Sequence, residues 1–277
     1  MILDFIAQLF LVSVKLIASA LVIGYLCGNK EYLVRTLFIF AFTMILNPYL
    51  KYLFQIQEYP GAIGYAWVFP SGHMQASFAF WGWLAVEYRN RFFSCFVIIL
   101  LTGVAWGLIY FGYHTLLDVL GAISAGLITF VGYDRLRKIK LFQKHVYLLG
   151  YLLLLVSIPL ILTYPQKLYV IRSQIWIGVG LLLAFPIAFL IQSRNEMNFS
   201  FYQKVYVVAL AVLGVLLINV GVQWIHGAAP SFSMPVLVTI QYVLTALWVG
   251  AGVSLLFALL LKKWIQFKKV KTVQAHG

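Results

Sequence analysis

The chain has 277 residues, of which 63% are hydrophobic and only 10% are charged. This composition excludes a water-soluble globular domain and indicates that lipid surrounds most of the chain. Twenty Lys and Arg residues against seven Asp and Glu residues give a net charge of +13. Because the basic residues stand in short connections between apolar runs, we interpret them as topology signals and expect no nucleic-acid partner.

Nine apolar segments follow one another, each close to the roughly 20 residues that a helix needs to cross a bilayer. They are Phe5–Cys27, Tyr32–Phe54, Ser71–Glu87, Phe92–Phe111, His114–Tyr133, Val146–Thr163, Ser173–Ile191, Lys204–Trp224 and Met234–Leu261. The predicted fold is therefore an all-α, polytopic membrane bundle of about nine transmembrane helices. The basic connection near residue 140 divides it into a front part, residues 1–140, and a rear part, residues 141–277, with four helices and a basic tail.

The basic residues also predict an orientation. Sixteen of the Lys and Arg residues fall on one side of the nine segments, whereas Lys51, Lys167 and Arg172 fall on the other. Since Lys and Arg concentrate in cytoplasmic loops, we expect the N-terminus outside and the C-terminus in the cytoplasm, in a bacterial inner membrane. We expect no cleavable signal peptide, because Asp4 stands where such a peptide carries basic residues.

Pro70, Ser71, Gly72 and His73 form the first polar cluster, at the outer start of the third segment. Pro suits a first helical turn, and Gly lets a substrate approach the backbone. The free N–H groups of such a turn bind anions, and His73 would donate a proton to a leaving alkoxide. The alternative is a tight turn followed by an interfacial histidine.

His114 and Asp118 form a second polar cluster, at the outer start of the fifth segment. Their i, i+4 spacing predicts one shared helical face. A carboxylate there can hold the proton of one imidazole nitrogen and leave the other free to attack phosphorus. The alternative is that Asp118 is only a helix-start charge, but polar groups of this kind are costly in a bilayer and favour a functional site.

These two clusters resemble the type 2 phosphatidic acid phosphatase (PAP2) superfamily, whose second motif is Pro-Ser-Gly-His and whose third ends in His-x3-Asp. The likeness covers residues 45 to 125 or so. It implies that His114 is the nucleophile, that Asp118 orients it and that His73 is the general acid. It further implies that Ser71 and Gly72 bind the phosphate oxygens of a membrane lipid. Lys51 aligns with the lysine of the first family motif and either contacts phosphate or is an interfacial anchor. We expect no metal or cofactor, since backbone N–H groups, Lys51 and His73 would stabilise the intermediate.

The sequence departs from the family pattern at two arginines. Counting back from His114 puts Leu108 at one arginine position, and Glu58 occupies the other. Because a phosphomonoester dianion needs several fixed cations, this site is expected to prefer a diester or diphosphate-linked lipid, or to transfer a headgroup. Sphingomyelin synthases, which resemble this family and have a His-His-Asp triad, are the model for headgroup transfer. The neutral donors proposed in place of the arginines are Gln55, Gln75, Tyr110 and Tyr113.

Two classes of function remain open. The first is a lipid phosphatase or phosphotransferase that works at the outer leaflet through a phosphohistidine on His114. The second is a non-catalytic lipid binder or transporter, which the missing arginines favour. The rear part has no catalytic spacing and suits substrate delivery or partner docking. Asp4, Gln8 and Lys15 fall on one helical face, so the first segment is expected to line the cavity or to lie along the outer surface.

Overall fold

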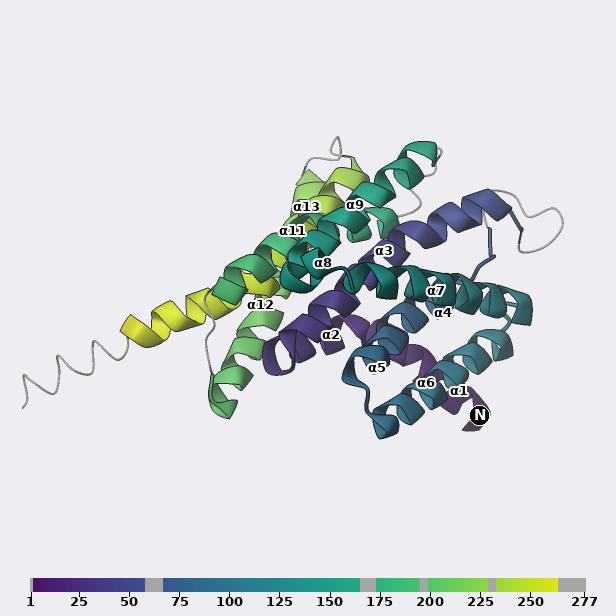
Figure 1. Cartoon of the computed structure of the whole chain (residues 1–277), viewed down its shortest axis with the longest axis horizontal. Coiled ribbons are helices and arrows are strands. Elements are labelled where there is room, and N and C mark those ends of the chain that lie inside the picture. The colour runs from purple at the N-terminus through teal and green to yellow at the C-terminus, as the bar shows by residue number, and fades with distance from the viewer. Residues whose placement is uncertain (1, 58–66, 165–172, 195–198, 229–232, 264–277) are drawn as a thin grey trace, which may run out of the picture.

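The computed structural model describes residues 2–57, 67–164, 173–194, 199–228 and 233–263. Within these ranges the regular elements are helices, apart from an isolated bridge between Gln57 and Trp67. Figure 1 shows the helices gathered into one elongated bundle. Seven helices are long and apolar enough to cross a membrane, and a bent pair makes an eighth candidate. The all-α, polytopic prediction is confirmed, whereas the number nine is not.

The spanning helices follow the predicted segments closely. They are α3 (Lys30–Phe54), α6 (Arg91–Tyr110), α7 (Leu116–Arg137), α9 (Val146–Thr163), α11 (Ser173–Arg194), α12 (Phe201–Ala228) and α13 (Met234–Leu247), the last continuing through the π-helical turn η2 (Trp248–Gly252) to Lys263. The short α8 (Lys140–Lys144) joins α7 to α9. The third predicted segment is instead built of three short pieces, α4 (Gly72–Ser77), the π-helical turn η1 (Phe78–Gly82) and α5 (Trp83–Tyr88).

The first predicted segment is a broken helix. It consists of α1 (Ile2–Lys15) and α2 (Ile17–Cys27), which meet at an angle of 52° around Leu16. Helix α1 packs against α6, while α2 packs against α3 and α12. The Tyr110 hydroxyl donates a hydrogen bond of 2.8 Å to Oδ1 of Asp4, which ties the first turn of α1 to the end of α6. The bend therefore turns the axis of α2 away from that of α1 directly after Lys15.

Helix α3 is the central element, because it contacts both parts of the chain. It packs against α4 and α5 in the front part and against α9 and α11 in the rear part. Gly178 allows the close approach of α11, since a Cβ at that position would lie 2.4 Å from the carbonyl oxygen of Ala41. One buried apolar cluster runs through both parts. The division at residue 140 is thus a proposal about how the chain is organised, and its two halves share a core.

A buried ion-pair cluster fixes the end of the bundle where α3 begins and α7 finishes. The carboxylate of Glu87 lies 3.2 Å from Nη1 of Arg137 and 3.6 Å from Nη1 of Arg35. Nε1 of Trp83 donates to the same carboxylate at 3.1 Å, and the Arg137 guanidinium stacks on the Trp83 ring. Because removing one partner would leave a buried charge uncompensated, the cluster locks α3, α5 and α7 together. This clamp lies at the opposite end of the bundle from the two histidine motifs.

Candidate active site

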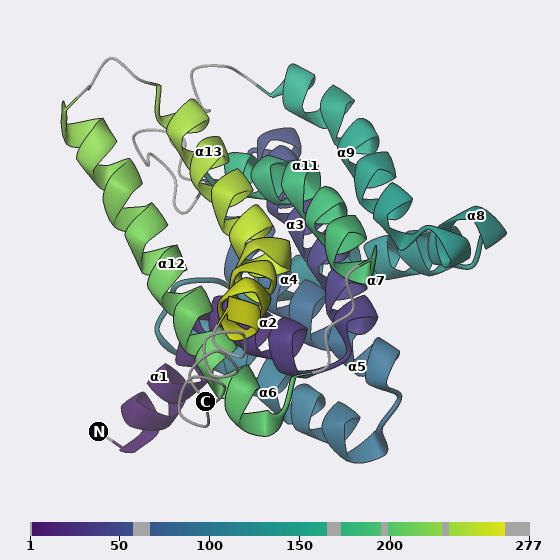
Figure 2. The ribbon, with the colours of Figure 1, turned by 90° about the vertical axis from the view of Figure 1, so that its left-hand side faces the viewer.

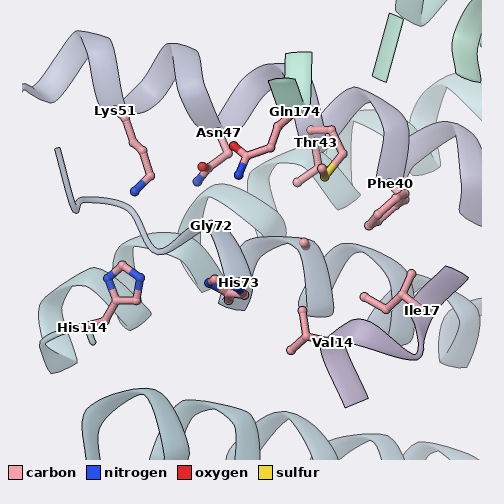
Figure 3. A pocket seen from close by; sticks show the side chains of 12 residues that line it. Val14, Ile17, Phe40, Thr43, Asn47, Lys51, Gly72, His73, His114 and Gln174 are labelled. Atoms are coloured by element: carbon pink, nitrogen blue, oxygen red, sulfur yellow. The ribbon is translucent and has the colours of Figure 1, made fainter. Parts of the chain in front are cut away.

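A cavity of about 350 Å³ lies where α3 ends and α4 begins. It is lined by Val14, Ile17, Phe40, Thr43, Met44, Asn47, Lys51, Gly72, His73, Ala76, His114 and Gln174. Figure 3 shows Lys51 and Asn47 on one wall and His114 on the opposite wall, with Phe40 and Ile17 toward the other end. The two histidine motifs, which are separate in the sequence, thus meet in one space.

Ser71 caps the helix that carries His73. Its hydroxyl accepts a hydrogen bond of 3.4 Å from the backbone N–H of Met74, so α4 begins at Gly72 and His73 lies in its first turn. Pro70 was predicted in the first turn of the helix, but it lies before the N-cap residue Ser71. The side chain of Ser71 is fully buried and is not part of the cavity wall, whereas Gly72 and His73 are.

The starts of α4 and α7 are joined directly. The backbone N–H of Ser71 donates a hydrogen bond of 3.1 Å to the carbonyl oxygen of Asp118. Gly72 also allows a close approach to α3, since a Cβ there would lie 3.1 Å from Oδ1 of Asn47. Backbone contacts therefore hold the His73 motif and the His114 motif in a fixed relation to each other.

His114 lies in the connection between α6 and α7, not inside a helix. The i, i+4 spacing predicts that it shares a helical face with Asp118, and this is wrong, because α7 begins only at Leu116. Thr115 is the N-cap: its hydroxyl accepts from the N–H of Asp118, and the Asp118 carboxylate accepts from the N–H of Thr115 at 2.8 Å. This reciprocal capping box starts α7 directly after Thr115, so His114 lies just before the helix.

Asp118 nevertheless lies next to the imidazole of His114. Its Oδ2 is 3.7 Å from Nδ1 of His114, and the carboxylate is almost fully buried. In the described part of the chain, Nδ1 of His114 is buried without a hydrogen-bond partner. At 3.7 Å the two atoms are beyond hydrogen-bond distance. A hydrogen bond from Nδ1 to this carboxylate would leave Nε2 as the nitrogen available for other chemistry.

Lys51 is buried on the cavity wall instead of reaching into bulk solvent. Its ammonium donates hydrogen bonds to the carbonyl oxygens of Trp67 at 2.9 Å and of Val68 at 3.1 Å. Burial and this positive charge lower the pKa of His114, which lies outside the spanning helices, although Asp118 acts in the opposite direction. A neutral imidazole at neutral pH is the form that a nucleophile requires.

Two amide side chains in the cavity wall were missed by the sequence analysis. Asn47 lies one turn before Lys51 on α3 and donates to the carbonyl oxygen of Pro70 at 3.2 Å and to Oε1 of Gln75 at 2.7 Å. Gln174 comes from α11 in the rear part of the chain. The four-residue spacing of Asn47 and Lys51 on one helical face was an available signal, whereas nothing in the sequence indicated Gln174.

The neutral donors proposed in place of arginines have separate surroundings. Gln75 is fully buried behind Asn47, and Tyr110 donates its hydroxyl to Asp4 instead. Gln55 is the C-cap residue of α3. Leu108, at one missing arginine position, is buried and apolar, while Glu58, at the other, lies outside the described residues.

A second cavity of about 210 Å³ adjoins the first through His73. Gln8, Lys15 and Tyr113 line it, together with apolar residues of α1 and α6. Gln8 and Lys15 of the first segment therefore line this second cavity and not the first, whereas the Asp4 carboxylate accepts a hydrogen bond from Tyr110 at the end of α6. His73 thus lies between two cationic side chains, Lys51 in one cavity and Lys15 in the other.

The comparisons with known proteins support one relationship. A family model described as the PAP2 superfamily matches residues 32–140, the stretch that contains both histidine motifs and Lys51. No curated protein and no solved structure matches the chain significantly. The matched stretch runs from α3 to the start of α8 and leaves the four rear helices without a match.

Proposed function

We propose that the chain is a membrane enzyme of the phosphatase or phosphotransferase type. Residues 32–140 match the PAP2 superfamily, and this family supports such a function. Its substrate would be a lipid phosphate or diphosphate, attacked by His114 at the outer face of the membrane. The observation that carries this proposal is the convergence of Lys51, His73 and His114 on one cavity, with Asp118 behind His114.

The proposed reaction has two steps. Nε2 of His114 attacks phosphorus, and the bond from phosphorus to the leaving oxygen breaks while His73 gives that oxygen a proton. Asp118 takes the hydrogen bond from Nδ1 of His114 and stabilises the positive charge of the phosphohistidine. Water then attacks phosphorus while the bond from phosphorus to Nε2 of His114 breaks; His73 accepts a proton from the water, and phosphate leaves. If an alcohol replaces water, the same step transfers the phosphoryl group.

The charge of the cavity supports a substrate that carries little negative charge at the reacting phosphorus. Lys51 is the cation that lines the larger cavity, and Asn47 and Gln174 add neutral amides. A dianionic monoester is held best by several cations, so this set favours a phosphodiester or the inner phosphorus of a diphosphate. The second candidate function is therefore transfer or cleavage of a headgroup from a phosphodiester lipid.

The orientation of the site follows from the distribution of charge. Among the described residues, Arg35 and Arg137 stand at the end of the bundle where they pair with Glu87, and Lys51 stands at the other end. Since basic residues concentrate in the cytoplasm, we propose that the cavity faces the outer side and that its substrate comes from the outer leaflet.

Mass spectrometry of defined lipids incubated with the purified protein tests the function. The panel holds phosphatidate, a polyprenyl diphosphate, phosphatidylglycerophosphate and common diester phospholipids, with and without an alcohol acceptor. We expect cleavage at phosphorus in at least one lipid class, with free phosphate identifying a phosphatase and a new headgroup identifying a transferase. If every lipid stays unchanged while one of them binds saturably, the non-catalytic reading replaces this proposal.

His73→Ala separates the general acid from the nucleophile. Without a proton donor, turnover of a lipid alkyl phosphate should fall by about 10²–10⁴-fold. An aryl phosphate with a good leaving group needs little protonation, so its turnover should fall by less than about tenfold. The measurement is kcat/KM for both substrates in the same detergent. An equal loss on the two would mean that His73 binds phosphate or supports the fold instead of protonating the leaving oxygen.

A further inference from the structure

A third cavity, of about 290 Å³ and mostly apolar, lies between the front and rear parts of the chain. It is walled by the last turn of α1, α2 and α3 on one side and by α11, α12 and α13 on the other. Its polar lining residues are Lys15 at the end of α1 and Gln241, Tyr242 and Thr245 on α13. Figure 2 shows α11, α12 and α13 as neighbouring helices beside α2 and α3. This cavity and the polar cavity share Val14, Ile17, Phe40 and Met44 in their walls, so the two spaces adjoin.

The face of α3 that lines both cavities changes from polar to apolar along the helix. Lys51 and Asn47 line the polar cavity, Met44 and Phe40 line both, and Leu37 lines the apolar cavity. These residues recur at intervals of three or four and therefore form one stripe along α3. The stripe begins with an ammonium at the site end and becomes purely apolar deeper in the bundle.

Helix α11 repeats this gradient in the opposite chain direction. Gln174 lines the polar cavity, and Ile177, Leu181 and Phe185 line the apolar cavity, again at intervals of three or four. Because α11 begins at the site end and α3 finishes there, the two polar ends lie together. An elongated space with a polar, cationic end and an apolar continuation is complementary to an amphiphile.

We propose that the apolar cavity holds a hydrocarbon chain of the lipid whose phosphate occupies the polar cavity. The rear helices would then be part of the substrate site: α11 would contribute to both cavities, and α12 and α13 would close the chain-binding one. This assignment deepens the proposed function and rests on it. A chain that leaves the bilayer gains no hydrophobic free energy, so selection would depend on how well its length and shape pack in the cavity.

Photolabelling tests the chain site without relying on catalysis. The probe is a polyprenyl diphosphate with a diazirine near the end of its hydrocarbon chain, in phosphatidylcholine vesicles that contain the full-length protein. We expect saturable labelling of Ile177, Leu181 or Val215, reduced by excess unlabelled polyprenyl diphosphate. Labelling confined to lipid-facing positions such as Ile98 and Ile99, which are both highly exposed, would overturn the proposal.

Filling the cavity tests the same assignment through turnover. Val215 is half-buried in its wall on α12, whereas Val212 is exposed on the same helix and lies outside it. Val215→Trp should lower kcat/KM for a long-chain substrate by about tenfold or more, because the indole would occupy space that the hydrocarbon chain needs. It should leave a short-chain analogue with the same headgroup within about twofold, and Val212→Trp should leave both unchanged.

The outcomes distinguish this inference from the proposed function. Saturable labelling of the cavity in a protein that turns over no lipid would retain the chain site and refute the enzyme. Turnover by the wild-type protein, with equal effects of Val215→Trp on long and short chains, would retain the enzyme and refute the chain site. If the Val215 variant does not fold, the labelling pattern of the wild-type protein decides.

Discussion

Replacing His114 with alanine is expected to reduce lipid turnover by at least about 10⁴-fold. The variant removes the atom that would bond to phosphorus, and His73, the other histidine of the cavity, has the separate role of protonating the leaving oxygen. Its fold should change little, because Nδ1 of His114 makes no hydrogen bond within the described residues and the residue precedes helix α7. Initial rates in detergent, together with the thermal unfolding midpoint, measure the two effects separately.

The matched control is His145→Ala, which removes a histidine at the opposite end of the bundle, between α8 and α9. It should retain full turnover. A second readout addresses the intermediate: after rapid quenching with substrate labelled at phosphorus, the wild-type protein should carry an acid-labile, base-stable phosphoryl group that His114→Ala lacks. Turnover of His114→Ala within about tenfold of the wild type would refute the phosphohistidine mechanism.

The long helices could be predicted from the sequence, because an apolar run of spanning length in lipid has only one way to satisfy its backbone. The breaks could not. The π-helical turn in the third segment accompanies packing of Phe78 against Gly126 and of Gly82 against Phe130. These contacts join residues far apart in the sequence, and hydropathy carries no trace of them. The bend at Leu16 could not be predicted either, because no proline lies near it in the sequence.

The candidate site shows the same division between local and distant information. The Pro-Ser-Gly-His turn and the proximity of His114 to Asp118 follow from short motifs. The start of α7 is also marked in the sequence, since Thr115 followed three residues later by Asp118 is a capping pattern. Asn47 could have been found from its four-residue spacing to Lys51, whereas Gln174 was not predictable, because an isolated amide in an apolar helix has no spacing that marks it.

Asp118→Asn is expected to lower kcat by about 10²–10⁴-fold while the protein stays folded. The loss should follow from charge: asparagine keeps an oxygen that can accept from Thr115, yet it cannot stabilise a positive His114 imidazole. The stability change should be small, within about 1 kcal/mol, because the cap of α7 is largely retained. Both quantities are measured on one preparation, kcat by initial rates and stability by thermal unfolding.

Thr115→Ala separates the role of Asp118 in capping α7 from its effect on His114. Asp118 has two duties in the structure, since its Oδ2 accepts from the N–H and the hydroxyl of Thr115 and lies 3.7 Å from Nδ1 of His114. Thr115→Ala removes the hydroxyl half of the cap and should cost about 1 kcal/mol of stability, with kcat within about tenfold of the wild type. If both variants lose stability and both retain kcat, Asp118 is only a helix cap. If Asp118→Asn alone loses kcat, its carboxylate acts on His114, and the capping box serves to hold that carboxylate in place.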